Sequence, residues 1–162
     1  KMSRSNVAEA FADTGRRIKL PLISLAAALI MVNFMMLGGE QSPIFLIANA
    51  FSSVTGDNWS YFSAFLGALG SFFSGSATVS NLTFGGIQQS VAIQVGLPIS
   101  VVLALQSAGA AMGNMVCINN IIAVSTILGI ANKEGYIIKK TIIPMMVYGV
   151  IAALVGAGLI LI

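Results

Sequence analysis

A run of about 75 residues, 58–132, contains no Asp, Glu, Lys, Arg or His, and this run limits the fold of the chain more than any other feature. Within it, the stretch SGSATVSN at residues 74–81 lies between two strongly apolar segments. A water-soluble domain needs charged side chains over its surface. We therefore expect the run to lie in a lipid bilayer and the polar stretch to be a binding site shielded from bulk water.

The composition of the whole chain also predicts an integral membrane protein. Hydrophobic residues make up 57% of the chain and charged residues 8%, against roughly 25% charged residues in a soluble domain. The mean hydropathy is +0.94. The basic residues lie at the edges of apolar segments, which favours membrane orientation over nucleic-acid binding. The single Cys117 offers no disulfide framework and no ligand cluster, so we expect neither a metal nor a cofactor.

Two basic clusters orient the chain across the bilayer. Residues 1–19 carry five basic residues and residues 132–140 carry three, so the positive-inside bias places both in the cytoplasm. Residues 20–38 form a first apolar segment, near the lower limit for spanning a core roughly 30 Å thick. Residues 141–162 form the last transmembrane span.

Residues 42–56 predict a short helix that does not cross the membrane. Ser42 is a suitable N-cap, Pro43 occupies the first helical position and Gly56 is a stop signal. A helix of about 13 residues is too short to span a bilayer. We expect an interfacial or buried helix.

Residues 59–95 consist of two apolar halves on either side of the polar stretch. Each half is about 15 residues long, or roughly 22 Å as a helix, which is too short to cross the hydrocarbon core. This pattern predicts a re-entrant helical hairpin with its tip at residues 74–81 and a second half-helix that begins near Asn81. Two full crossings would give the same orientation to the rest of the chain.

Residues 97–131 read as one discontinuous transmembrane helix. An apolar run is interrupted near its middle, at residues 113–120, by Gly113 and three asparagines. We expect the second half of this helix to begin near Asn120.

The two breaks provide chemistry without formal charge. Each exposes the N-terminus of a half-helix, whose free N–H groups and partial positive charge suit a carboxylate. The carbonyl ends of the first halves suit a coupling cation. The candidate substrate-binding residues are the polar side chains at both breaks: Ser74, Ser76, Thr78, Ser80, Asn81, Asn114, Asn119 and Asn120. This site for a small organic anion requires the two breaks to meet in space.

Other interpretations of these residues stay open. Gly109 and Gly113 form a GxxxG pair that favours close helix packing, and so does a stripe of small residues on the last span, Gly149, Ala152, Ala153 and Gly156. A channel or pore-forming subunit would use the same polar tip as its selectivity filter. An intramembrane enzyme is disfavoured, because Cys117 and the serines have no His, Lys or carboxylate in the run to activate them.

The segments FLGALGSFFSGSATVSNLTFGGIQQS and LALQSAGAAMGNMVCINNIIAVSTILGIANKEG resemble the C-terminal part of the lactate permease family. The resemblance implies an all-α, polytopic protein of the bacterial inner membrane and part of an inverted-repeat transporter. Its substrates would be L-lactate, or glycolate in some members, taken up with H⁺, with Na⁺ as the alternative coupling cation. We expect the chain to be a fragment that works with the rest of the permease chain.

The chain departs from the pattern of this family at two positions. It has Ala77 where many members have Asp, and Asn114 where many have Lys. The nearest acids, Glu40 and Asp57, fall at the expected outer interface. We therefore expect the proton-carrying group to lie elsewhere in the permease.

Overall fold

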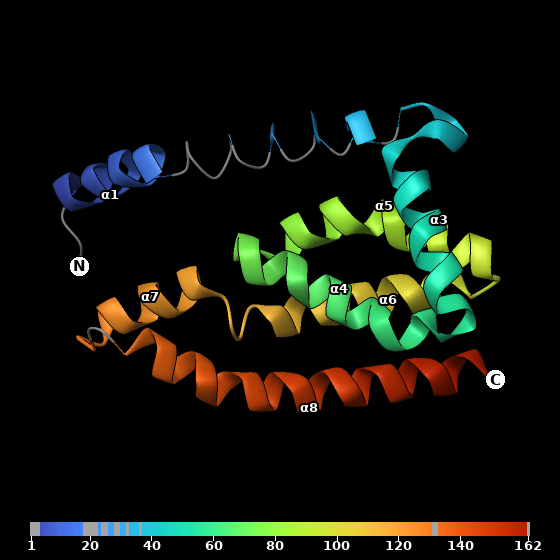
Figure 1. Cartoon of the computed structure of the whole chain (residues 1–162). Coiled ribbons are helices and arrows are strands. Elements are labelled where there is room, and N and C mark those ends of the chain that lie inside the picture. Colours follow the sequence, from blue (N-terminus) through green and yellow to red (C-terminus); the bar gives the residue numbers. More distant parts are fainter. Residues whose placement is uncertain are drawn as a thin grey trace.

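The computed structural model describes residues 4–17, 23, 26–27, 30–31, 33–35, 37–130 and 133–161. Every regular element in these ranges is helical, beginning with α1 (Arg4–Arg17) (Figure 1). The expected first span, residues 20–38, is interrupted by residues outside the described ranges and stays a prediction.

Helix α3 (Pro43–Thr55) follows the short 3-10 helix η1 (Gly39–Gln41) and has the ends that its sequence predicts. Ser42 Oγ accepts a hydrogen bond from Phe45 N at 3.2 Å, which satisfies one free N–H of the first turn. Gly56 ends the helix with a φ of 51°, a conformation that favours glycine. The buried side chains of Ile44 and Ala48 pack this helix against the bundle.

Helices α4 (Trp59–Ser74) and α5 (Ala77–Val95) pack side by side and are joined by Gly75 and Ser76 (Figure 1). A second 3-10 helix, η2 (Gly56–Asn58), precedes α4. The expectation that the second half begins near Asn81 is wrong, because Ser76 caps the helix and Gly75 reverses the chain with a φ of 72°. The tip is therefore two residues long, and the rest of the polar stretch lies in the first turns of α5.

Helices α6 (Ile99–Gly113) and α7 (Ile118–Ile127) are separated by a break at residues 114–117. This break is narrower than the expected 113–120, and α7 does not begin near Asn120. Turn hydrogen bonds from Met115 N to Met112 O at 3.1 Å and from Val116 N to Gly113 O at 3.2 Å tighten the end of α6. Ile121 N then donates to Cys117 O at 3.0 Å, so α7 starts at the first residue after the break.

Helix α8 (Glu134–Ile160) begins well before Thr141, where its start was expected. The bond from Ile137 N to Lys133 O, at 3.0 Å, closes its first turn, so most of residues 132–140 is helical. Charged residues suit an exposed first turn as well as they suit a loop. In the described part of the chain, two helical stretches, residues 99–125 and 134–160, are long and apolar enough to cross a membrane.

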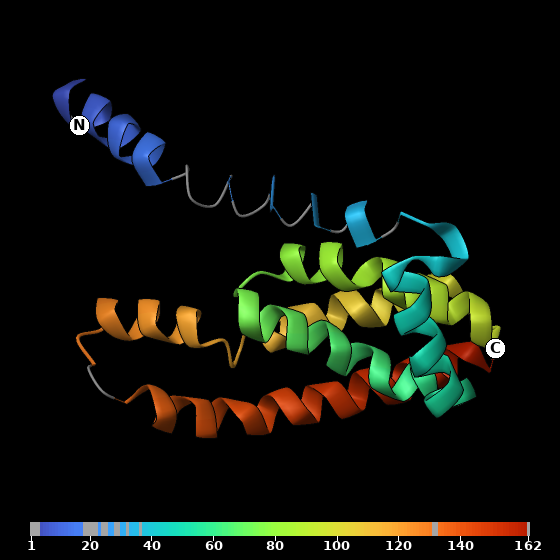
Figure 2. The same cartoon turned by 45° about the horizontal axis from the view of Figure 1, so that its top comes forward.

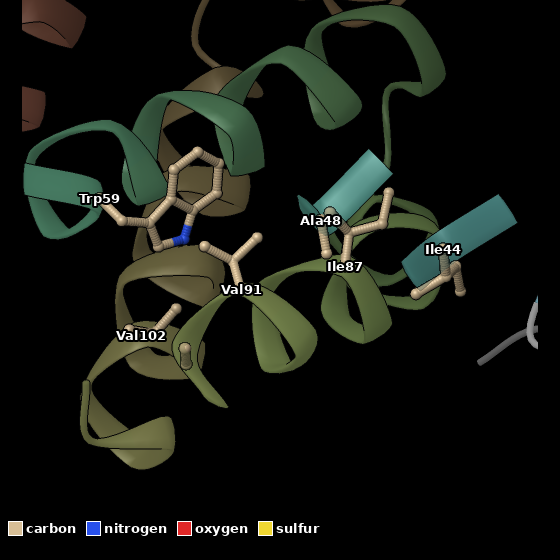
Figure 3. Close-up of a cluster of buried hydrophobic side chains, with 7 residues drawn as sticks. Ile44, Ala48, Trp59, Ile87, Val91 and Val102 are labelled. Atoms are coloured by element: carbon tan, nitrogen blue, oxygen red, sulfur yellow. The ribbon is translucent and has the colours of Figure 1, made fainter. Parts of the chain in front are cut away.

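The bundle is built from α4, α5 and α6, with α3 at one end and α8 along its length (Figures 1 and 2). At the α3 end, buried Trp59, Val91 and Val102 come together from α4, α5 and α6 (Figure 3). This apolar cluster joins four helices, because α3 adds Ile44 to it. The N-terminal part of α8 extends beyond this bundle and packs beside α7.

Glycines bring α4 and α6 into close contact. A Cβ on Gly109 would collide with the backbone carbonyl of Ala64, and one on Gly113 would collide with that of Ala68. The packing interpretation of this GxxxG pair is therefore confirmed.

The small-residue stripe on α8 also has the packing role that the sequence predicts. Gly149 lies under the ring of Phe65, where a Cβ would be 2.8 Å from Cζ. At Gly156 the same atom would be 2.6 Å from Cδ1 of Leu105. Phe65 is on α4 and Leu105 is on α6, so α8 covers both helices.

Candidate functional site

The tip of the α4–α5 hairpin meets the break between α6 and α7. A Cβ placed on Gly75 would lie 3.2 Å from Cys117 Sγ, 3.5 Å from Asn120 Oδ1 and 3.8 Å from Asn119 Cβ. The predicted meeting of the two breaks is therefore confirmed. Glycine at the tip is what allows this approach, because any side chain would press on the break.

Four helix ends come together at this contact. The C-terminal ends of α4 and α6 lie here, and so do the N-terminal ends of α5 and α7. From this point α5 and α7 run in opposite directions (Figures 1 and 2). The Ser76 side chain satisfies Val79 N at 3.3 Å, which leaves the N–H groups of Ala77 and Thr78 without an intrahelical acceptor. Two positive helix ends beside one another favour an anion.

The hydroxyl groups at the tip differ in the hydrogen bonds that they already make. Ser74 is exposed, and its Oγ donates to Gly70 O at 2.8 Å and accepts from Ser76 N at 3.2 Å. Ser76 is half-buried and serves as the N-cap of α5. Thr78 is exposed and lies in the first turn of α5. All three surround the tip, and Ser74 and Ser76 also hold its backbone.

Ser80 and Asn81 face the interior of the bundle. Ser80 is fully buried, and its hydroxyl donates to Gly67 O at 2.7 Å and accepts from Gln106 Nε2 at 3.2 Å. This hydroxyl ties the hairpin to α6. Asn81 is half-buried, and its Oδ1 accepts from Gln106 Nε2 at 3.3 Å.

The three asparagines of the second break have different surroundings. Asn119 is exposed and Asn120 is half-buried, and both lie against the tip. The Oδ1 atom of Asn114 is buried without a hydrogen-bond partner within the described ranges. Asn114 and Asn120 also line a cavity of about 220 Å³ between the break, α7 and the start of α8. The break thus offers amides to the tip on one side and to this cavity on the other.

A buried polar network supports the hairpin from behind, and the sequence pattern does not single out its members. Ser63 and Gln88 are fully buried and Gln106 is 1% exposed. Gln88 on α5 is hydrogen-bonded to Ser63 on α4 and to Gln106 on α6, and Gln106 donates in turn to Ser80. One signal could have identified them. A glutamine inside an uncharged apolar helix must find partners, because an unpaired amide is costly to bury.

The whole chain, residues 1–162, matches the family model described as L-lactate permease. A Haemophilus influenzae protein whose name places it with the L-lactate permeases is 58% identical over 95% of this chain. The L-lactate permease of Bacillus subtilis is 30% identical over 82% of the chain, and a glycolate permease of Escherichia coli is 29% identical over 89%. The chain spans 29%, 23% and 26% of the lengths of these three relatives. No solved structure matches the chain.

Proposed function

Because the chain belongs to the L-lactate permease family, we propose that it is one part of a secondary active transporter for L-lactate or a related small 2-hydroxy-monocarboxylate such as glycolate. Its relatives are named as permeases, so the chain belongs to a membrane transport protein and not to an enzyme. It spans less than a third of the curated relatives that it matches, so the proposed activity is that of the whole permease.

The observation that supports a binding site is the contact of Gly75 with Asn119 and Asn120. In the proposal, the substrate carboxylate lies at the paired N-termini of α5 and α7, and side-chain amides and hydroxyls bind its oxygens and its 2-hydroxyl group. The proposed ligands are polar residues of the two breaks: Ser74, Ser76, Thr78, Asn81, Asn114, Asn119 and Asn120. Ser80 enters the proposal as a support for the hairpin.

We further propose that α4 and α5 form a re-entrant hairpin and that α6 and α7 form one broken span in the bacterial inner membrane. Both basic clusters would then face the cytoplasm, and the segment would be most of one inverted repeat. The contact at Gly75 would lie near the middle of the bilayer, where irregular backbone requires a protein or water-filled surrounding.

The coupling cation in this proposal is H⁺, with Na⁺ as the less favoured choice. The C-terminal ends of α4 and α6 bring partial negative charge to the same place as the substrate. The run 58–132 contains no carboxylate or histidine, so a group that carries the proton would come from another part of the permease.

Counterflow in proteoliposomes tests the proposed function. Full-length permease would exchange labelled L-lactate against a panel of L-lactate, glycolate, acetate and succinate, with imposed pH or Na⁺ gradients. We expect saturable exchange of the 2-hydroxy-monocarboxylates and accumulation driven by the pH gradient. Flux that neither saturates nor accumulates against a gradient would favour a channel and contradict the proposal.

A further inference from the structure

A chain of hydrogen bonds runs from Trp59 at the α3 end of the bundle to Asn81 near the tip. Trp59 Nε1 donates to Gln88 Oε1 at 2.8 Å, and Gln88 Nε2 donates to Gln106 Oε1 at 2.8 Å. Gln106 Nε2 lies 3.3 Å from Asn81 Oδ1. Figure 3 shows the indole nitrogen of Trp59 turned into the interior, toward α5.

The orientation of the Gln88 amide is determined at both of its ends. An indole N–H can only donate, so the atom of Gln88 that faces Trp59 must be the oxygen. A backbone carbonyl can only accept, so the atom 2.8 Å from Ser63 O must be the nitrogen. With the Ser63 hydroxyl 2.9 Å from the oxygen, the buried amide is fully hydrogen-bonded.

Gln106 repeats this orientation one step closer to the tip. The Gln88 nitrogen donates, so the end of Gln106 that faces it must be the oxygen. The other end lies 3.4 Å from the backbone carbonyl of Ser80, which can only accept, so it must be the nitrogen. Gln106 therefore presents a donor to Asn81.

The chain of donors and acceptors then determines which end of Asn81 is free. Its Oδ1 accepts from Gln106, so its NH₂ group points away from Gln106. In the part of the chain that the structure describes, Asn81 Nδ2 has no hydrogen-bond partner. An NH₂ group donates and never accepts, so it suits a carboxylate oxygen and does not suit a cation.

We propose that Gln88 and Gln106 are positioning residues that hold the NH₂ group of Asn81 toward the substrate as a fixed donor. This inference rests on the proposed function, because it needs Asn81 to contact the carboxylate. Without Gln106, the Asn81 amide could turn its oxygen toward the carboxylate, and two acceptors would then face each other. The network sets the specificity of the site for anions.

The test measures the KM for L-lactate and the apparent melting temperature of full-length permease in proteoliposomes and detergent. Gln106→Met keeps the length of the side chain and removes its donor. We expect the KM to rise about 10-fold while kcat changes little. Gln94→Met, on α5, is the control that replaces a glutamine outside the network, because Gln94 Oε1 accepts from Ser52 Oγ at 2.7 Å and Gln94 has no bond to Gln88 or Gln106. It should leave the KM unchanged.

A second background separates positioning from folding. In Asn81→Ala permease, Gln106→Met should cause no further rise in KM, because the residue that it positions is gone. If Gln106→Met lowers only the melting temperature, or raises the KM equally in both backgrounds, the positioning role is overturned. If Gln106→Met permease does not insert into the membrane, the KM of Gln88→Met permease is measured in both backgrounds, and we expect a smaller rise in KM. If Asn81→Ala itself leaves transport unchanged, the proposed site fails instead.

Discussion

Gly75 lies against Asn120, so that a Cβ on Gly75 would be 3.5 Å from the Asn120 side-chain oxygen. The two residues are on different helical pairs and far apart in the sequence. Their contact joins two breaks in otherwise apolar helices into one polar region. In full-length permease, substitutions at this contact and behind it should therefore change transport.

Gly75→Ala should lower L-lactate uptake strongly, by about 10-fold. The left-handed backbone at φ 72° costs a residue with a Cβ about 1–2 kcal/mol, and the methyl group would press on Cys117 Sγ at 3.2 Å. Both effects strain the contact between the tip and the break. Gly85→Ala is the control, because a Cβ there meets open space on α5. Equal uptake by the two variants would show that the tight tip is not needed.

The sequence predicts the meeting of the breaks but not their extent. The polar stretch SGSATVSN reads as a non-helical tip, yet only Gly75 and Ser76 lie outside helices. Ser and Thr in the first turn of a helix can bond to nearby backbone, so their composition does not separate a tip from a capped helix start. Likewise, Asn119 and Asn120 are already within α7.

Ser76→Asp and Ser76→Asn should differ sharply in transport while folding alike. Both side chains cap helices about as well as serine, so the start of α5 should be kept. The aspartate also places a negative charge near the proposed carboxylate site. At about 5 Å and an effective dielectric constant of about 20, the repulsion is about 3 kcal/mol, or roughly 100-fold in affinity. Binding of labelled L-lactate would measure it, and equal affinities would argue against an anion at the tip.

Asn81→Leu should lower L-lactate uptake at least about 10-fold and leave membrane insertion intact. Leucine fills a similar volume but gives neither a donor for the substrate nor an acceptor for Gln106. Gln89→Leu, at an exposed position on α5, provides the comparison and should transport normally. Uptake is measured per molecule inserted in the membrane. Normal uptake by inserted Asn81→Leu permease would remove Asn81 from the site.

Gly109→Ala should destabilise the permease by about 1–3 kcal/mol, the usual cost of overpacking a core. Its Cβ would meet the backbone of Ala64, which cannot move aside as a flexible side chain could. Gly158→Ala, in open space on α8, should leave the melting temperature in detergent unchanged or slightly higher. A similar melting temperature for both variants would mean that α4 and α6 can separate without loss.

Helix packing through small residues could be predicted from spacing alone, as at Gly109 and on α8, since such stripes have a known periodicity. The hydrogen-bond network behind the hairpin could not be predicted from the sequence. Gln88 and Gln106 are partners only because α5 and α6 lie side by side, and the hydrogen bond from Gln106 to Ser80, which leads us to propose Ser80 as a support, arises for the same reason. Side-chain roles of this kind depend on tertiary contacts.

Disulfide formation between Gly75→Cys and Cys117 tests the union of the two breaks most directly. A Cβ at position 75 would lie 3.2 Å from Cys117 Sγ, a separation that suits a disulfide bond. The experiment uses full-length permease from which every cysteine except Cys117 has been removed. Gly85→Cys in the same background is the control. The reduced Gly75→Cys variant should keep about a tenth of normal L-lactate uptake, as expected for Gly75→Ala. Mild oxidation in membranes should link residues 75 and 117 in high yield and stop this remaining uptake until reduction restores it. If both cysteines react with a maleimide but never join, the breaks do not form one site.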